Sequence, residues 1–104
     1  MIFRGDVWDA DFADHGHRPC VVITRDQAIP VLSRVNVVVV SRSFRGHPAE
    51  VELGRHHGLD EPCVANCDVI ASVEKALLTR RRGKLDPPAL RSLEDALRFA
   101  LALE

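Results

Sequence analysis

The sequence predicts one mainly β domain, α+β in class, in which about five to seven short strands close into a small barrel against a single C-terminal helix. Short stretches with alternating or β-branched apolar residues fill most of the chain, and each is bounded by turn residues. The C-terminal segment changes to helical spacing. The length of 104 residues suits a single domain, 1–104.

The strands are predicted in chain order. Segment 8–12 alternates apolar and acidic residues, which is typical of a half-buried strand. Segments 20–24 and 35–40 are rich in valine, which indicates strands buried on both faces. Three further strands are predicted at 50–53, 64–73 and, at an edge of the sheet, 79–85.

The last predicted element is an amphipathic helix of about 16 residues that packs across the barrel. Apolar residues between 90 and 101 recur at helical spacing. Asp86 before Pro87 supplies an N-cap followed by proline in the first turn. On the exposed side, Glu94 and Arg98 have the (i, i+4) spacing of an ion pair.

The amino-acid composition excludes fewer classes of function than the order of residues along the chain does. Fourteen basic and fifteen acidic residues give a net charge of −1, which provides no overall field for a polyanion. Twelve of the basic residues are arginine, whose planar fork matches phosphate oxygens in pairs. The absence of a long apolar run predicts a soluble, cytoplasmic protein, and three cysteines fit reduced thiols.

Two sites can be drawn from cysteine and histidine, and both are disfavoured. Cys63 and Cys67, with the histidines at 56–57, form a possible zinc set, but residues four apart on a strand lie ~13 Å apart. No metal or other cofactor is therefore expected. Cys20 beside His17 suggests an activated thiol, yet Cys20 begins a buried apolar run where a thiolate is unfavourable.

The more informative residues lie where strands begin or end. Arg18 precedes Pro19, which holds its backbone extended, and the buried strand that follows anchors it at the rim of the sheet. A second rim segment, 41–46, places two hydroxyls and two arginines after a valine strand. Such groups suit an oxyanion or phosphate clamp, and equally an ordinary polar turn.

The order of these motifs resembles the MazF/PemK toxins, the sequence-specific endoribonucleases, or mRNA interferases, of type II toxin–antitoxin pairs. The resemblance covers essentially the whole chain and includes the C-terminal helix. It is carried by the segments RGDVW at 4–8, GHRPCVVI at 16–23, VS at 40–41, RGHPAEV at 45–51 and DVIASV at 68–73.

The resemblance implies an SH3-like barrel of the CcdB/MazF toxin type that forms a homodimer. It implies metal-independent cleavage of single-stranded RNA, and inhibition by a cognate MazE-like antitoxin that occupies the same groove. The family's catalytic Arg and Thr fall on Arg18 and Ser41, so serine replaces threonine here. Val69 stands where the family has Gln, and Asp11 and Asp14 are imperfect substitutes for a loop Glu of some relatives.

The implied reaction assigns roles to rim residues. The ribose 2′-OH attacks the neighbouring phosphorus and gives 2′,3′-cyclic phosphate and 5′-OH ends. Arg18 stabilises the dianionic phosphorane, Ser41 donates a hydrogen bond, and His17 is the favoured acid or base because its ordinary pKa is near 6.5. The residues predicted to bind flanking RNA are Ser43, Arg42, Arg45, Arg80, Arg81 and Arg82. The triple arginine is equally consistent with a solvated edge strand.

Two other functions fit the same barrel. One is a non-enzymatic, CcdB-like toxin directed at gyrase, but such proteins end in Trp-Gly-Ile and this chain ends Leu-Ala-Leu-Glu. The other is a module that binds nucleic acid or peptide without cutting it. A basic strip of rim arginines, with Asp60 and Glu61 placed elsewhere, is expected for the nuclease.

Overall fold

The computed structural model describes residues 1–13 and 16–103. The elements are β1 (Asp6–Phe12), β2 (Gly16–Val22), β3 (Arg34–Ser41), β4 (Glu50–Leu53), η1 (Arg55–His57), β5 (Cys63–Glu74), η2 (Lys75–Leu77), β6 (Leu78–Lys84) and α1 (Pro87–Ala100). Every predicted strand is present, although β2 begins earlier than expected. Asp14 lies outside the described residues. None of the described helices has the length and apolar character to cross a bilayer.

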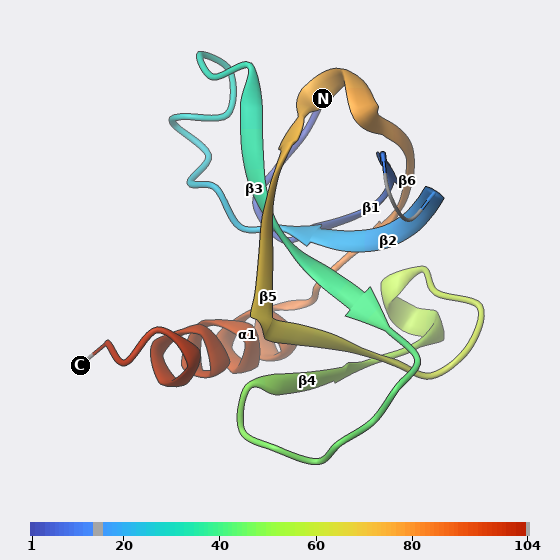
Figure 1. The fold of residues 1–104 in the computed structure, drawn as a ribbon, viewed down its shortest axis with the longest axis vertical. Helices are drawn as coiled ribbons and strands as arrows, with labels where there is room; N and C mark the ends of the chain where they lie inside the picture. The colour runs from blue at the N-terminus through green and yellow to red at the C-terminus, as the bar shows by residue number, and fades with distance from the viewer. Residues whose placement is uncertain (14–15, 104) are drawn as a thin grey trace.

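The six strands form one sheet in the order β4-β5-β3-β2-β1-β6, with every neighbouring pair antiparallel. The sheet curls into a half-barrel, with α1 lying beside β4 and β5 (Figure 1). The pairing of β3 with β5 shifts register between Val38 and Val39, a feature that bends a strand and increases its twist. The long β5 lies between β3 and β4 and pairs with both.

The edge strands β4 and β6 do not pair with one another in the described sheet. Instead, η1 packs against β6. Gly58 ends η1 with a φ of 93°, and a side chain there would overlap the carbonyl oxygen of Arg82. The sheet thus stays a half-barrel, and its edge at β6 is covered by η1 and its glycine turn rather than paired with β4. This close backbone approach leaves no room for a Cβ at position 58.

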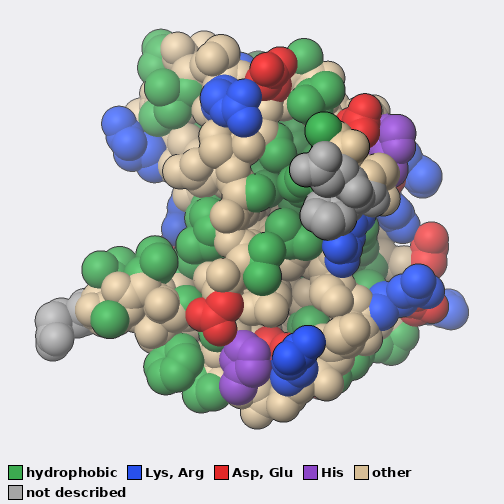
Figure 2. Space-filling model, viewed as in Figure 1, with side chains coloured by type: hydrophobic (Ala, Val, Ile, Leu, Met, Phe, Trp, Pro, Cys, Tyr) green, Lys and Arg blue, Asp and Glu red, His purple; other side chains and the backbone are tan. Residues whose placement is uncertain are grey.

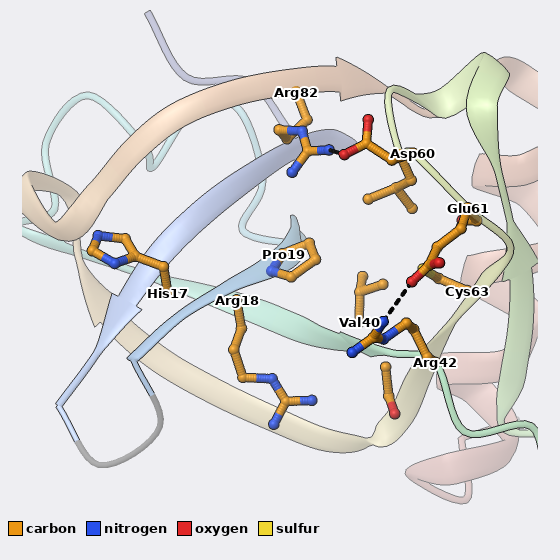
Figure 3. A pocket seen from close by; sticks show the side chains of 11 residues that line it. His17, Arg18, Pro19, Val40, Arg42, Asp60, Glu61, Cys63 and Arg82 are labelled. Atoms are coloured by element: carbon orange, nitrogen blue, oxygen red, sulfur yellow. Dashed lines mark hydrogen bonds and ion pairs between the residues drawn. The ribbon is translucent and has the colours of Figure 1, made fainter.

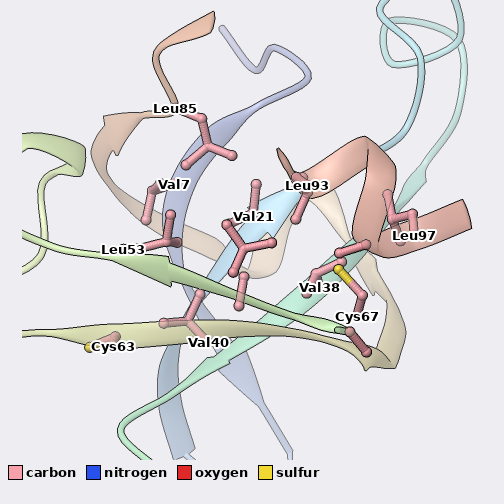
Figure 4. Close-up of a cluster of buried hydrophobic side chains, with 14 of the residues drawn as sticks. Val7, Val21, Val38, Val40, Leu53, Cys63, Cys67, Leu85, Leu93 and Leu97 are labelled. Carbon is pink, nitrogen blue, oxygen red and sulfur yellow. The ribbon is translucent and has the colours of Figure 1, made fainter. Parts of the chain in front are cut away.

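Both faces of the central strands are buried, as the valine-rich segments predict. Val21 belongs to the cluster beneath α1, where Leu93 is fully buried (Figure 4). Its neighbours Cys20 and Val22 belong to a second cluster, together with Ile29 from the β2–β3 connection. Alternation along β2 therefore feeds two cores, one covered by the helix and one by the curled sheet and its loops.

The helix begins as the sequence predicts and ends slightly earlier. Asp86 caps it by accepting a hydrogen bond of 3.1 Å from the first turn, and α1 has 14 residues. The expected (i, i+4) pair is not formed. Glu94 instead pairs with Arg4 at 2.8 Å, and Arg98 pairs with Asp95 at 2.9 Å. Tertiary contact with the N-terminal segment takes Glu94 away from its helical neighbour.

Candidate active site

A cavity of about 390 Å³ opens where β3 ends and the first half of β2 runs beside it (Figure 3). Its walls come from β2, β3, β6 and the segment that precedes β5. The lining residues are His17, Arg18, Pro19, Val40, Ser41, Arg42, Leu59, Asp60, Glu61, Cys63 and Arg82. The fold therefore brings all three predicted catalytic residues to one cavity, with His17 and Arg18 adjacent on β2 and Ser41 at the end of β3.

Arg18 is held by β2, where it lies opposite Ala10 of β1. The extended backbone before Pro19 agrees with the sequence prediction. Its side chain extends into the cavity and points away from the His17 ring (Figure 3). Within the described part of the chain, no ion pair or side-chain hydrogen bond holds its guanidinium. A cation with five donors and no acceptor among the described residues is suited to an anionic ligand.

Ser41 is the last residue of β3, where its pairing with Val64 of β5 anchors the backbone. Its Oγ accepts a hydrogen bond of 3.1 Å from the backbone N–H of Ser43. That contact uses a lone pair and leaves the hydroxyl proton to donate. Ser41 is thus a positioned donor at the wall of the cavity that also holds Arg18.

The other two arginines of the cavity are already paired with acids. Arg42 contacts Glu61 at 2.8 Å, and Arg82 contacts Asp60 at 3.1 Å. Arg82 also contacts Asp9 of β1 at 3.2 Å. The expectation that Asp60 and Glu61 lie away from the arginines is wrong. The β4–β5 connection folds back over the cavity, an arrangement that strand patterns in the sequence do not reveal.

Because of these ion pairs, the rim does not carry the basic strip of arginines that the sequence predicts. In Figure 2 the basic side chains on the visible face are interleaved with acidic ones and form no continuous strip. Asp60 and Glu61 were the functional candidates missed from the sequence. The one local signal for them is the Glu61-Pro62 step, which resembles Arg18-Pro19 in placing a charge on a restricted backbone.

His17 lines the cavity one residue before Arg18 on β2, and the two side chains project in different directions (Figure 3). Four of the predicted RNA-binding residues lie outside the cavity wall. Ser43 and Arg45 follow β3 in an exposed connecting segment, where the backbone N–H of Arg45 donates to Glu50 at 3.0 Å. Of the triple arginine, Arg82 alone lines the cavity. The RNA contacts of the other four, which include Arg80 and Arg81, stay predictions.

The cysteines are poor nucleophiles in this fold. Burial raises the pKa of the Cys20 thiol to about 12, and nearby Asp9 contributes in the same direction. Burial and Glu61 likewise raise the pKa of Cys63, although Arg42 and Arg82 oppose them. A thiol that stays protonated at neutral pH is unsuited to attack, so these residues act as small core side chains.

A cluster with possible metal ligands lies elsewhere, beside the start of α1. Ligand atoms of His56, His57 and Asp86 lie within 4.8 Å of one another. However, the Nδ1 atom of His57 accepts a hydrogen bond of 3.2 Å from Gly54, so the neutral ring carries its proton on Nε2. A metal-bound histidine normally donates from its other nitrogen, and the positive end of a helix disfavours a cation. The cluster fits a structural role, and Cys63 and Cys67 do not take part in it.

Comparison with known proteins assigns the family. The model of the PemK-like, MazF-like toxins of type II toxin–antitoxin systems matches residues 3–101. The chain belongs to this family. A probable endoribonuclease, MazF5 of Mycobacterium tuberculosis, is 38% identical over 101 residues, which cover 94% of this chain and 91% of that protein.

Solved structures agree with the assignment. The M. tuberculosis toxin MazF-mt6 has a TM-score of 0.89 at 27% identity, and the match covers 95% of this chain and 98% of the toxin. The MazE–MazF complex of Deinococcus radiodurans has a TM-score of 0.83 at 20% identity, covering 100% of this chain and 98% of that chain. The second likeness concerns the fold alone. The mainly β toxin fold expected from the resemblance is therefore confirmed.

Proposed function

We propose that this MazF/PemK-family protein is a toxin endoribonuclease that cleaves single-stranded RNA at the cavity around Arg18, acting as a single domain of residues 1–104. The observation that carries the proposal is the meeting of Arg18 and Ser41 in one cavity. The guanidinium has no ion-pair partner among the described residues, and the hydroxyl has a proton to donate. The MazF proteins of M. tuberculosis to which the chain is similar are named endoribonucleases.

The reaction suited to these groups is internal transfer within the RNA. The ribose 2′-oxygen attacks the adjacent phosphorus as it loses its proton, and the bond from phosphorus to the 5′-oxygen breaks. The products are a 2′,3′-cyclic phosphate and a 5′-OH end that has taken up a proton. No metal is needed for this balance, because side chains can stabilise charge and transfer both protons.

Arg18 acts on the charge that develops at phosphorus. Its guanidinium donates to two nonbridging oxygens at once, and Ser41 adds a further donor. Removing a comparable donor from other enzymes costs ~2.7–4 kcal/mol in the transition state. The guanidinium itself keeps its proton at neutral pH, so it is an electrostatic catalyst rather than a base.

His17 is the candidate for proton transfer. It lies on the cavity wall, and an imidazole exchanges protons near neutral pH. Its ring is turned away from Arg18, which suits two groups acting on different sides of a bound phosphodiester (Figure 3). Replacement by Asn would then flatten the dependence of rate on pH rather than weaken RNA binding.

The partners belong to the same proposal. A related mycobacterial endoribonuclease is described in complex with its cognate antitoxin, and the D. radiodurans protein as MazE–MazF. We assign to this chain a MazE-like antitoxin and a homodimeric state, with the cytoplasm as the compartment where RNA is met. A single small half-barrel offers a shallow cavity, and pairing with a second copy would extend it into a groove.

Incubation with a long, unstructured RNA tests the function directly. The expected result is cleavage at a few sequences, with new 5′ ends that a polynucleotide kinase labels without prior phosphatase treatment. Fragments with 5′-phosphate ends would contradict the internal-transfer chemistry. Stable binding without any new ends would instead favour the interaction module over the nuclease.

A further inference from the structure

We propose that Glu61 sets the RNA affinity of the candidate site, where it neutralises Arg42 and must be displaced by substrate phosphate. The inference rests on the proposed endoribonuclease function and concerns the strength of RNA binding. Among the arginines of the cavity, Arg18 faces it without an acidic partner in the described chain, whereas Arg42 is occupied by Glu61 at 2.8 Å (Figure 3).

The position of Glu61 is set by its backbone. Leu59, only 4% exposed, anchors the segment in the core, and Pro62 restricts Glu61 to an extended conformation. The thiol of Cys63 donates to the carbonyl oxygen of Glu61 at 3.3 Å. The carboxylate is therefore presented to the cavity from a fixed point rather than from a freely moving loop.

The two acid–arginine pairs of the cavity differ in how easily they open. The Arg82 side chain is 13% exposed and contacts Asp9 as well as Asp60, so it stays neutralised when one contact is lost. The Arg42 and Glu61 side chains are 78% and 50% exposed. Solvent weakens such an exposed pair, and a phosphate can replace the carboxylate on Arg42 at small cost.

That small cost falls on every RNA that places a phosphate at Arg42. A cost shared by all of them leaves the ratio of their affinities unchanged and lowers each affinity by the same factor. An RNA held by phosphate contacts alone then occupies the site poorly, whereas an RNA that makes further contacts with the cavity still binds. Glu61 thus limits binding by competing for Arg42 and by repelling the RNA backbone.

The Glu61→Gln substitution tests this because it keeps the shape and removes the charge. The matched control is Glu74→Gln, which removes the same charge from an exposed arginine pair, with Arg34, at the opposite end of β3. Binding is measured by fluorescence anisotropy against a mixed-sequence 2′-O-methyl oligoribonucleotide, which lacks the attacking hydroxyl. The measurement is repeated at several salt concentrations and in an Arg42→Gln background.

We expect Glu61→Gln to bind about two- to fivefold more tightly at low salt, the ratio corresponding to one exposed ion pair. The slope of log K against log salt should steepen by ~0.7, as for one additional phosphate contact on a single strand. Glu74→Gln should change none of these, and the effect should vanish with Arg42→Gln.

Equal behaviour of the two glutamine variants would overturn the proposal. So would weaker binding by Glu61→Gln, since that result makes Glu61 a direct contact to a base, or an effect that persists without Arg42. The outcomes also separate the two proposals. A wild-type protein that binds the oligonucleotide but cuts no RNA contradicts the nuclease function, whereas normal cutting with an unaltered Glu61→Gln variant contradicts the role of Glu61 alone.

Discussion

Two regions of the molecule differ in what holds their side chains: the core under α1, or helix-covered end, and the surroundings of the cavity, or cavity end. Leu93 of α1 is fully buried among valines and leucines from several strands, and this packing holds its side chain in place. At the cavity, Arg18 is held by the backbone of β2, while its charged end has no protein partner among the described residues. Stability and activity therefore rest on different residues, and single substitutions should lower one without lowering the other.

The helix-covered end is expected to give the largest loss of stability. Leu93→Ala removes a fully buried side chain and should lower the free energy of unfolding by about 2–5 kcal/mol. Urea denaturation followed by circular dichroism measures this. Leu101→Ala is the control, since that side chain is 52% exposed and should matter little. Similar small losses for both variants would contradict the assigned core.

Arg18→Ala tests the cavity end. We expect RNA cleavage to fall by roughly 10²–10³-fold with an unchanged melting temperature, because the lost donor acts on the transition state and not on the fold. Initial rates on a fluorogenic RNA give the first value and thermal denaturation the second. The exposed Arg25→Ala variant should retain full activity. Retention of wild-type rates by Arg18→Ala would remove the site assignment.

The turn that joins the two ends should respond to a single methyl group. Gly58→Ala combines left-handed strain of ~1–2 kcal/mol with ~1–3 kcal/mol of overlap against β6, for a total of roughly 2–5 kcal/mol. Gly54→Ala is the matched substitution. The backbone at Gly54 is extended, and no neighbouring atom lies within 4 Å of the position that the new Cβ would take. Chemical denaturation of both variants compares them. A tolerated Gly58→Ala would mean that η1 does not cover the edge at β6 in solution.

Acidification should weaken the turn after β3. Burial raises the pKa of Glu50, but hydrogen bonds from the backbone N–H groups of Arg45 and Gly46 outweigh it and lower the pKa below its usual 4.5. A lowered folded-state pKa stabilises the protein above that value, and the contribution is lost as the pH falls below it. Denaturation at a series of pH values from 7 downward should therefore show the difference between Glu50→Gln and wild type shrinking as the pH falls below 4.5.

Chelation should have no effect at either end. Every step at the cavity is assigned to side chains, and the histidine cluster near α1 has the wrong tautomer for a metal. Cleavage rate and melting temperature should therefore be unchanged by excess EDTA. Loss of activity that zinc restores would instead support the Cys63 and Cys67 site considered from the sequence.

Local pattern predicts much of this molecule. Alternating and apolar β-branched segments locate the first five strands, the segment 79–85 is predicted as an edge strand, and Asp86 with Pro87 locates the start of α1. The Arg18-Pro19 step places a cation at the start of a buried strand. These inferences succeed because propensity, capping and the restriction before proline act over a few residues.

Charge partners were not predictable in the same way. Glu94 pairs with Arg4, 90 positions away, rather than with its helical neighbour. Asp60 and Glu61 come to Arg82 and Arg42 because η1 and Gly58 pack against β6 at the edge of the half-barrel. Ion pairs form between whichever charges the backbone brings within a few ångströms, and sequence separation says nothing about that distance.

Local sequence is thus sufficient for the elements, for the anchoring of Arg18 and for the family resemblance that suggests RNA as substrate. The folded chain decides which charges surround the cavity: one arginine without an acidic partner in the described residues, and two that are neutralised. The physical reason is the separation along the chain over which each kind of interaction acts. Backbone preferences are settled between near neighbours, whereas electrostatic competition at a binding site depends on groups that meet only after the sheet has curled.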